Sequence, residues 1–308
     1  MYQNTIPVFS RFQWLNHPRV INILRQFLKP PLVGRKGYDK VLMFRWLIYK
    51  QLMGCSFRDL ESVSGGIDHS TFVKFRKRLL KTNWFSKIFS ILSSAIAVNL
   101  TSITAVIDSS FVETYSKRDE LGSEYNGYKE KNGFKLHQII DWKTRLPLKY
   151  VVTPGARSDV ILGHHLIRGS PQEWKVKGFL GDKAYDDWKL VTRLKQKWKR
   201  IRVGIPVRKT PYERKAPIPP PVVNNRHVKE SDRYLKKSFL NKRSEIERYF
   251  SRKKRVFNLG EERTRHLKNF RANCDMIAIM EILEWLTTPQ IWLALFTKLI
   301  IAIRHMLK

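Results

Sequence analysis

The sequence has few cysteines. Its two cysteines, Cys55 and Cys274, lie far apart in the chain, and neither has a second cysteine nearby. This spacing excludes a disulfide framework and a zinc site built on cysteine, and it fits a reducing compartment. We therefore expect a cytoplasmic protein.

The sequence also lacks a long uninterrupted apolar run. Residues 1–18 contain no continuous apolar core of the kind that a signal peptide needs. Residues 291–307 are strongly apolar, but Lys298 and Arg304 interrupt them. We therefore expect a packed helix over residues 289–308, with a membrane anchor as the alternative.

Acidic residues are scarce compared with basic ones. The 308 residues include 59 Lys and Arg but only 26 Asp and Glu, which gives a formal net charge of +33. Because such an excess repels itself in a compact protein, it favours a polyanionic partner. Nucleic acid is that partner in our interpretation, and an anionic membrane surface is the weaker alternative.

The first third of the chain has helical periodicity. Apolar spacing predicts helices over 19–28, 38–53, 56–63, 71–80 and 84–97. The fourth of these carries Lys74, Lys77 and Arg78 beside an apolar face. A helix, a tight turn and a basic helix over residues 56–81 are typical of a helix-turn-helix reader, although solvated surface charges would give the same pattern. We expect residues 1–98 to form a helical DNA-binding domain.

From residue 103 the pattern changes to strands. We expect strands over 103–108, 134–141, 147–153, 176–182 and 201–207, and helices over 159–168, 186–198, 230–256 and 273–286. This order is typical of an α/β protein whose mixed sheet of five strands is flanked by helices. We expect the sheet to belong to a second domain over residues 99–288.

Two of the expected strands end in an aspartate. Asp108 closes the apolar run 103–107, and Asp182 closes the run 177–181. If these strands are neighbours, the two carboxylates lie side by side at an edge where α/β folds place their chemistry. Two such carboxylates repel one another and recruit a cation, for which Mg²⁺ or Mn²⁺ suits the oxygen ligands. Taken alone, Asp108 could instead cap a turn.

A third carboxylate comes from the helix expected over residues 230–256. Arg243, Glu247 and Lys254 are spaced by four and seven residues, so they share one face of that helix. Glu247 can then point at the edge of the sheet. An exposed Arg–Glu pair would show the same spacing, and Glu245 is a rival acid on another face.

The three acids resemble the DDE triad of RNase H-like transposases. More specifically, the chain resembles bacterial and archaeal insertion-sequence transposases of the insertion sequence 5 and insertion sequence 4 groups. The motifs that carry this resemblance are residues 105–110, 133–137, 154–159 and 181–186. The family pattern Tyr-x2-Arg-x3-Glu-x6-Lys matches at Arg243, Glu247 and Lys254, whereas Leu240 stands where the tyrosine is expected. The match favours Glu247 over Glu245.

The resemblance implies an RNase H-like catalytic domain that cuts and joins DNA. Asp108, Asp182 and Glu247 would hold two Mg²⁺ or Mn²⁺ ions, and Arg243 and Lys254 would contact phosphates. The implied partner is double-stranded DNA, both element ends and target, bound by a homodimer at the nucleoid. Two alternatives stay open: a catalytically inactive DNA-binding protein derived from a transposase, and a metal-dependent nuclease that cuts without joining.

The strand expected over 134–141 carries two further candidates for DNA contact. Lys135 and His137 alternate onto one of its faces. The resemblance places them near the DNA. A strand histidine that is simply hydrogen-bonded within the fold is the structural alternative for His137.

Overall fold

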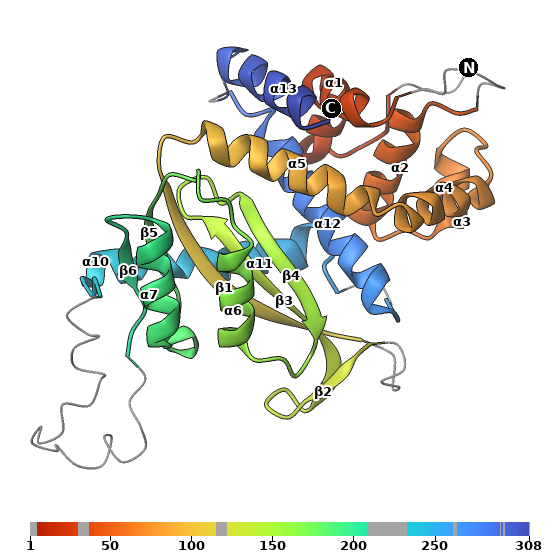
Figure 1. Ribbon diagram of the computed structural model, residues 1–308. Helices are drawn as coiled ribbons and strands as arrows, with labels where there is room; N and C mark the ends of the chain where they lie inside the picture. The colour runs from red at the N-terminus through yellow and green to blue at the C-terminus, as the bar shows by residue number, and fades with distance from the viewer. Residues whose placement is uncertain are drawn as a thin grey trace, which may run out of the picture. The chain divides into compact units, whose positions relative to one another are not determined.

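The computed structural model describes residues 5–29, 37–114, 122–207, 233–260, 264–289, 291 and 293–307. The chain divides into two compact units (Figure 1), one formed by residues 1–99 together with 252–308 and the other by residues 100–251. The two breaks fall after residue 99 and after residue 251.

The first unit is helical. Its described elements are the 3₁₀ helix η1 (Ser10–Asn16) and the α-helices α1 (Pro18–Phe27), α2 (Lys40–Met53), α3 (Phe57–Val63), α4 (His69–Lys81), α5 (Trp84–Asn99), α12 (Leu267–Trp285) and α13 (Leu293–Leu307). The five helices expected in the first third of the chain are all present, with ends shifted by a few residues. None of the helices in the described part of the chain is long and apolar enough to cross a membrane.

Helix α12 is the centre of this unit. Nearly every residue from Phe270 to Leu283 is buried, as expected for a helix that is packed on all sides. Its few polar side chains have partners among the other helices: Asn273 accepts from Arg76 at 2.8 Å and Asp275 accepts from Ser86 at 2.7 Å. Burial of polar groups is tolerated because each is hydrogen-bonded.

Helices α3 and α4 have well-defined starts. A capping box begins α3, in which the Ser56 hydroxyl accepts from Asp59 N–H at 3.2 Å and the Asp59 carboxylate accepts from Ser56 N–H at 2.7 Å. Asp68 caps α4 by accepting from Ser70 N–H at 2.8 Å. Phe72 and Leu79 bury the inner face of α4, and Lys74, Lys77 and Arg78 lie on its outer face.

The second unit is built on a mixed sheet. Its strands are β1 (Ile103–Glu113), β2 (Glu124–Asn126), β3 (Lys131–Asp141), β4 (Pro147–Pro154), β5 (Val176–Leu180) and β6 (Arg202–Gly204). The order is β2-β3-β1-β5-β6, and β4 also pairs with β3. Strands β1, β3 and β4 pair antiparallel, while β1, β5 and β6 pair parallel. Within the described residues the sheet has six strands, and β2 is the strand that the sequence pattern does not predict.

Strand β1 is longer than expected. It does not end at Asp108 but continues to Glu113, because residues 109–113 pair with residues 133–137 of β3. Its parallel pairing with β5 stops earlier, at Val106 opposite Leu180. Asp108 therefore lies inside the antiparallel half of the sheet but just beyond the carboxyl end of the parallel half.

Helices cover both faces of the sheet. The connections contain α6 (Asp159–Arg168), η3 (Lys183–Tyr185) and α7 (Trp188–Lys197), and the segment after β6 contains α10 (Lys237–Leu240), η4 (Asn241–Arg243) and α11 (Ser244–Val256). Alternation along β3 separates two faces: His137 contacts Asp159 at the start of α6, whereas Gln138 donates to the Tyr249 hydroxyl of α11 at 2.8 Å. Helices α6 and α11 thus pack on opposite faces (Figure 1).

The helix expected over residues 230–256 is present but starts later in the described part. Residues 233–236 are not helical, and the helical stretch from residue 237 to residue 256 consists of the short α10, the 3₁₀ helix η4 and α11. Phe239 of α10 packs over two strand glycines, since a Cβ at Gly178 or Gly204 would lie 2.9 Å from its ring. This close packing places α10 against β5 and β6.

Candidate active site

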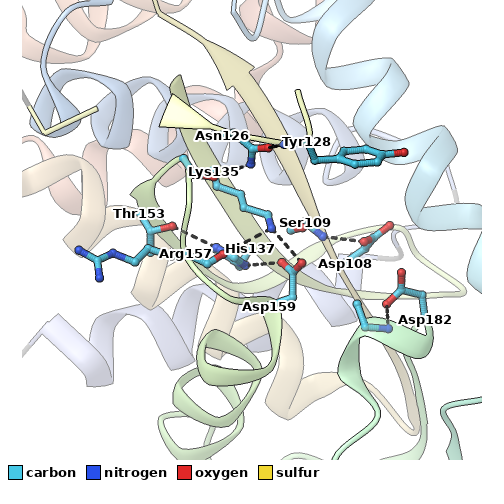
Figure 2. Close-up of polar contacts among 12 residues, drawn as sticks. Asp108, Ser109, Asn126, Tyr128, Lys135, His137, Thr153, Arg157, Asp159 and Asp182 are labelled. Atoms are coloured by element: carbon cyan, nitrogen blue, oxygen red, sulfur yellow. Dashed lines mark hydrogen bonds and ion pairs between the residues drawn. The ribbon is translucent and has the colours of Figure 1, made fainter. Parts of the chain in front are cut away.

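Two aspartates occupy matching positions along neighbouring strands, Asp108 within β1 and Asp182 just after the end of β5. Val106 of β1 is paired with Leu180 of β5, and Asp108 and Asp182 each lie two residues further along the chain. Parallel neighbours are about 4.8 Å apart, so the register brings the two carboxylates to one edge (Figure 2). The Asp182 carboxylate also accepts from Ala184 N–H at 2.8 Å, which fixes its orientation. The expectation that these two strands are neighbours is confirmed.

The environment of Asp108 disfavours its negative charge. Its side chain is only 20% exposed. Burial raises the pKa of this carboxyl to about 6, and the Asp182 and Asp159 carboxylates add to the shift, while Ser109 N–H and Arg243 oppose it. A carboxylate held in this way gains from a nearby cation.

Arg243 of η4 and Glu247 of α11 lie near Asp108. The Arg243 guanidinium lies 2.8 Å from a Glu247 oxygen and 4.0 Å from an Asp108 oxygen. The i, i+4 pairing of Arg243 and Glu247 persists although η4 precedes α11. Arg243 therefore connects the third acid to the first.

Glu245, the rival acid, faces elsewhere. Its carboxylate is 2.8 Å from Arg145 and 2.6 Å from Arg248, and its side chain is 13% exposed. Glu247 is 57% exposed and leans toward Asp108 through Arg243. The geometry therefore favours Glu247 as the third member of the acidic group.

The three acids have the chemistry of a site for a hard divalent cation. Their ligands are all carboxylate oxygens, and the pKa of Asp108 is raised by burial and, to a smaller extent, by the charge of Asp182, a charge that a cation would balance. In this structure Arg243 lies between Asp108 and Glu247, and the three carboxylates do not all come within 4.8 Å of one another. The donor set fits Mg²⁺ or Mn²⁺.

A second group of metal-type ligands lies in the helical unit. Within the described residues, Glu61, Asp68 and His69 bring ligand atoms within 4.8 Å of one another. Glu61 accepts from both the backbone N–H and the Nδ1 of His69, at 3.2 and 2.9 Å, and Asp68 caps α4. These contacts are those of a helix start, which accounts for the cluster.

A comparison with protein families identifies the sheet unit together with most of helix α12. The family model for the transposase DDE domain matches residues 100–283, well over half of the chain. The chain belongs to the DDE transposase family. A search of curated proteins finds no match. The DDE domain implies a nuclease or transposase enzyme, and members of this family generally use a divalent metal.

The transposase site has one acid that the sequence did not single out. Asp159 contacts Lys135 Nζ at 2.8 Å and His137 Nδ1 at 3.1 Å. Lys135 is 15% exposed and His137 is fully buried, so His137 offers no surface to DNA. The signals for Asp159 in the sequence are its place at a helix start, where an acid is common, and its place in the motif at residues 154–159.

The other basic candidates of the transposase lie on its surface. Lys254 is exposed near the end of α11, and Lys74, Lys77 and Arg78 are exposed on α4. Arg243 is 33% exposed beside the acids. All five side chains are accessible to a phosphate backbone, unlike His137.

Proposed function

We propose that this chain is a transposase of the insertion sequence 5 or insertion sequence 4 type, which cuts the ends of its element and joins them to target DNA. One observation supports the proposal most strongly. The β1–β5 register sets Asp108 beside Asp182, and Arg243 links Asp108 to Glu247. This is the order and placement of a DDE triad.

The acidic side chains would hold the cation, and the basic side chains would hold the DNA. Asp108, Asp182 and Glu247 supply the oxygen ligands. Bound Mg²⁺ or Mn²⁺, two ions in this proposal, would make an attacking water or 3′-hydroxyl more acidic and stabilise the leaving oxygen. Arg243 and Lys254 contact phosphates in this proposal.

The catalytic unit has an RNase H-like arrangement in this proposal. The support is the strand order β4-β3-β1-β5-β6. The antiparallel strands come first in this unit, and the parallel strands β5 and β6 follow α6 and α7. The first acid lies on the central strand β1, and the second comes after its parallel neighbour β5. The connections through α6 and α7 are crossovers between parallel strands.

Helices α3 and α4 form the DNA reader in this proposal. The two helices pack together and are separated by a short turn, and the exposed face of α4 carries Lys74, Lys77 and Arg78. The net charge of +33 supports double-stranded DNA as the partner. Because both ends of an element must be cut, we propose a homodimer on DNA.

Strand transfer distinguishes this function from its two alternatives. The substrate is a pre-cut DNA end taken from the sequence that flanks the gene, mixed with a supercoiled plasmid and Mg²⁺ or Mn²⁺. We expect the end to become joined to the plasmid. Cleavage of uncut DNA without any joining would favour a nuclease, and binding without either reaction would favour an inactive DNA-binding derivative.

A further inference from the structure

Polar side chains from two strands lie around Asp159. It is the first residue of α6, and its side chain is 21% exposed. Lys135 Nζ lies 2.8 Å from one of its oxygens and His137 Nδ1 lies 3.1 Å from the other. The Ser109 hydroxyl of β1 helps to lower the pKa of this carboxyl, and Ser109 is paired with His137 in the sheet register. Figure 2 shows the Lys135 and His137 side chains converging on Asp159.

Ser109 connects Asp159 to the catalytic strand. Its partner in the β1–β3 register is His137, which contacts Asp159, and its backbone N–H donates to the Asp108 carboxylate at 2.7 Å. Successive side chains of a strand point to opposite faces, so Ser109 reaches α6 while Asp108 faces α11. Any shift of Ser109 therefore moves the backbone group that orients Asp108.

The charges in this network are balanced. Burial opposes ionisation of Asp159, but hydrogen bonds from His137, Lys135 and Ser109 outweigh it and lower the pKa to about 2. Burial lowers the pKa of His137, and its Nε2 lies 3.0 Å from the Thr153 hydroxyl of β4. A neutral His137 can donate from Nδ1 to Asp159 and accept from Thr153. Lys135 is then the cation that balances the carboxylate.

We propose that Asp159 is a positioning residue of the transposase, which fixes the β1 segment around Ser109 and thereby presents Asp108 beside Asp182. The inference rests on the proposed function, because Asp108 must be a ligand for its position to matter. It gives Lys135 and His137 a role in holding Asp159 in place of a contact with DNA. Outer partners of metal ligands commonly act in this way.

The test is the Asp159→Asn variant of the full chain. This change keeps the shape of the side chain and removes its charge. Mn²⁺ binding is measured by electron paramagnetic resonance of the free ion, and the Mn²⁺ dependence of DNA cleavage is measured in parallel. We expect the Kd for Mn²⁺ to rise about tenfold or more, while the Kd for DNA without metal stays near the wild-type value.

Asp187→Asn is the matched control. Asp187 also stands at a helix start, is 23% exposed, and pairs with a histidine, His164, at 2.8 Å. Its second oxygen accepts from Lys189 N–H at 2.8 Å. We expect Asp187→Asn to lose stability like Asp159→Asn but to bind Mn²⁺ as the wild type does. Ser109→Ala, which removes only the hydroxyl that helps to lower the pKa of Asp159, should weaken Mn²⁺ binding in the same direction.

The outcomes separate this inference from the proposed function. If the wild type binds Mn²⁺ and cleaves DNA, but Asp159→Asn and Ser109→Ala bind Mn²⁺ with unchanged affinity, the positioning role is overturned and the transposase function stands. Equal weakening by Asp187→Asn would overturn it too, since the effect would then be general loss of stability. A wild type that neither binds Mn²⁺ nor cleaves would overturn both.

Discussion

Replacing Asp108 by asparagine should stabilise the chain when no divalent metal is present. In the folded protein the pKa of Asp108 is raised from 3.8 to about 6. Between these values the folded chain binds more protons than the unfolded chain, so stability falls as the pH rises through this range. Above about pH 6 the charged carboxylate remains as a constant cost, which asparagine does not have.

The size of the effect can be worked out from the pKa of Asp108. A rise from 3.8 to about 6 corresponds to about 3 kcal/mol of free energy of unfolding, at about 1.4 kcal/mol for each pKa unit. The hydrogen bond that the charged carboxylate accepts from Ser109 N–H is already contained in this net shift. We therefore expect a gain of about 3 kcal/mol at pH 8.

Urea unfolding with a chelator, repeated from pH 4 to pH 8, measures this gain. The advantage of Asp108→Asn should be absent near pH 4, grow through pH 6 and stay constant above it. Asp141→Asn is the control, because Asp141 of β3 accepts from Thr104 N–H at 3.1 Å and from Thr144 N–H at 2.9 Å, and its loss should destabilise at every pH. An Asp108→Asn variant less stable than the wild type at pH 8 would refute the reasoning.

Three further predictions concern other parts of the chain. Glu281→Ala should cost about 3 to 5 kcal/mol in urea unfolding, because its partner Lys253, 3.4 Å away, is also buried; replacing both residues by apolar ones should recover most of the loss. Lys77→Ala should weaken binding to all DNA sequences alike and lower the slope of log K against log salt by about one. Glu245→Gln should destabilise the chain but keep DNA cleavage, whereas Glu247→Gln should keep stability and lose cleavage, as a gel assay with matched thermal melts would check.

Much of the catalytic unit could be predicted because its signals are local. The runs before Asp108 and Asp182 are short and apolar, and an acid at the end of each predicts both the strands and the shared edge. The extension of β1 to Glu113 could not be predicted in this way. Residues 109–113 mix hydroxyl, apolar and acidic side chains, and their pairing with β3 joins residues far apart in sequence.

The candidate site was predictable in its acids and not in its supporting residues. Asp159 comes after Ser158 at a helix start, so its sequence pattern is that of a cap. Only the fold brings Lys135 to it across 24 residues. The same fold buries His137, which alternation alone places on an accessible face. The packing of Phe239 over Gly178 and Gly204 is equally hidden, since it joins residues far apart in the sequence.

Cleavage of DNA by the Asp182→Asn protein tests the central claim most directly. Asp182 is the acid that the β1–β5 register places beside Asp108, and this change keeps its shape while removing a ligand charge. We predict that the variant binds DNA from the flanks of its gene like the wild type but has lost Mg²⁺-dependent cleavage. Cleavage at the wild-type rate, with wild-type dependence on Mg²⁺, would contradict the assignment of a DDE site at this edge of the sheet.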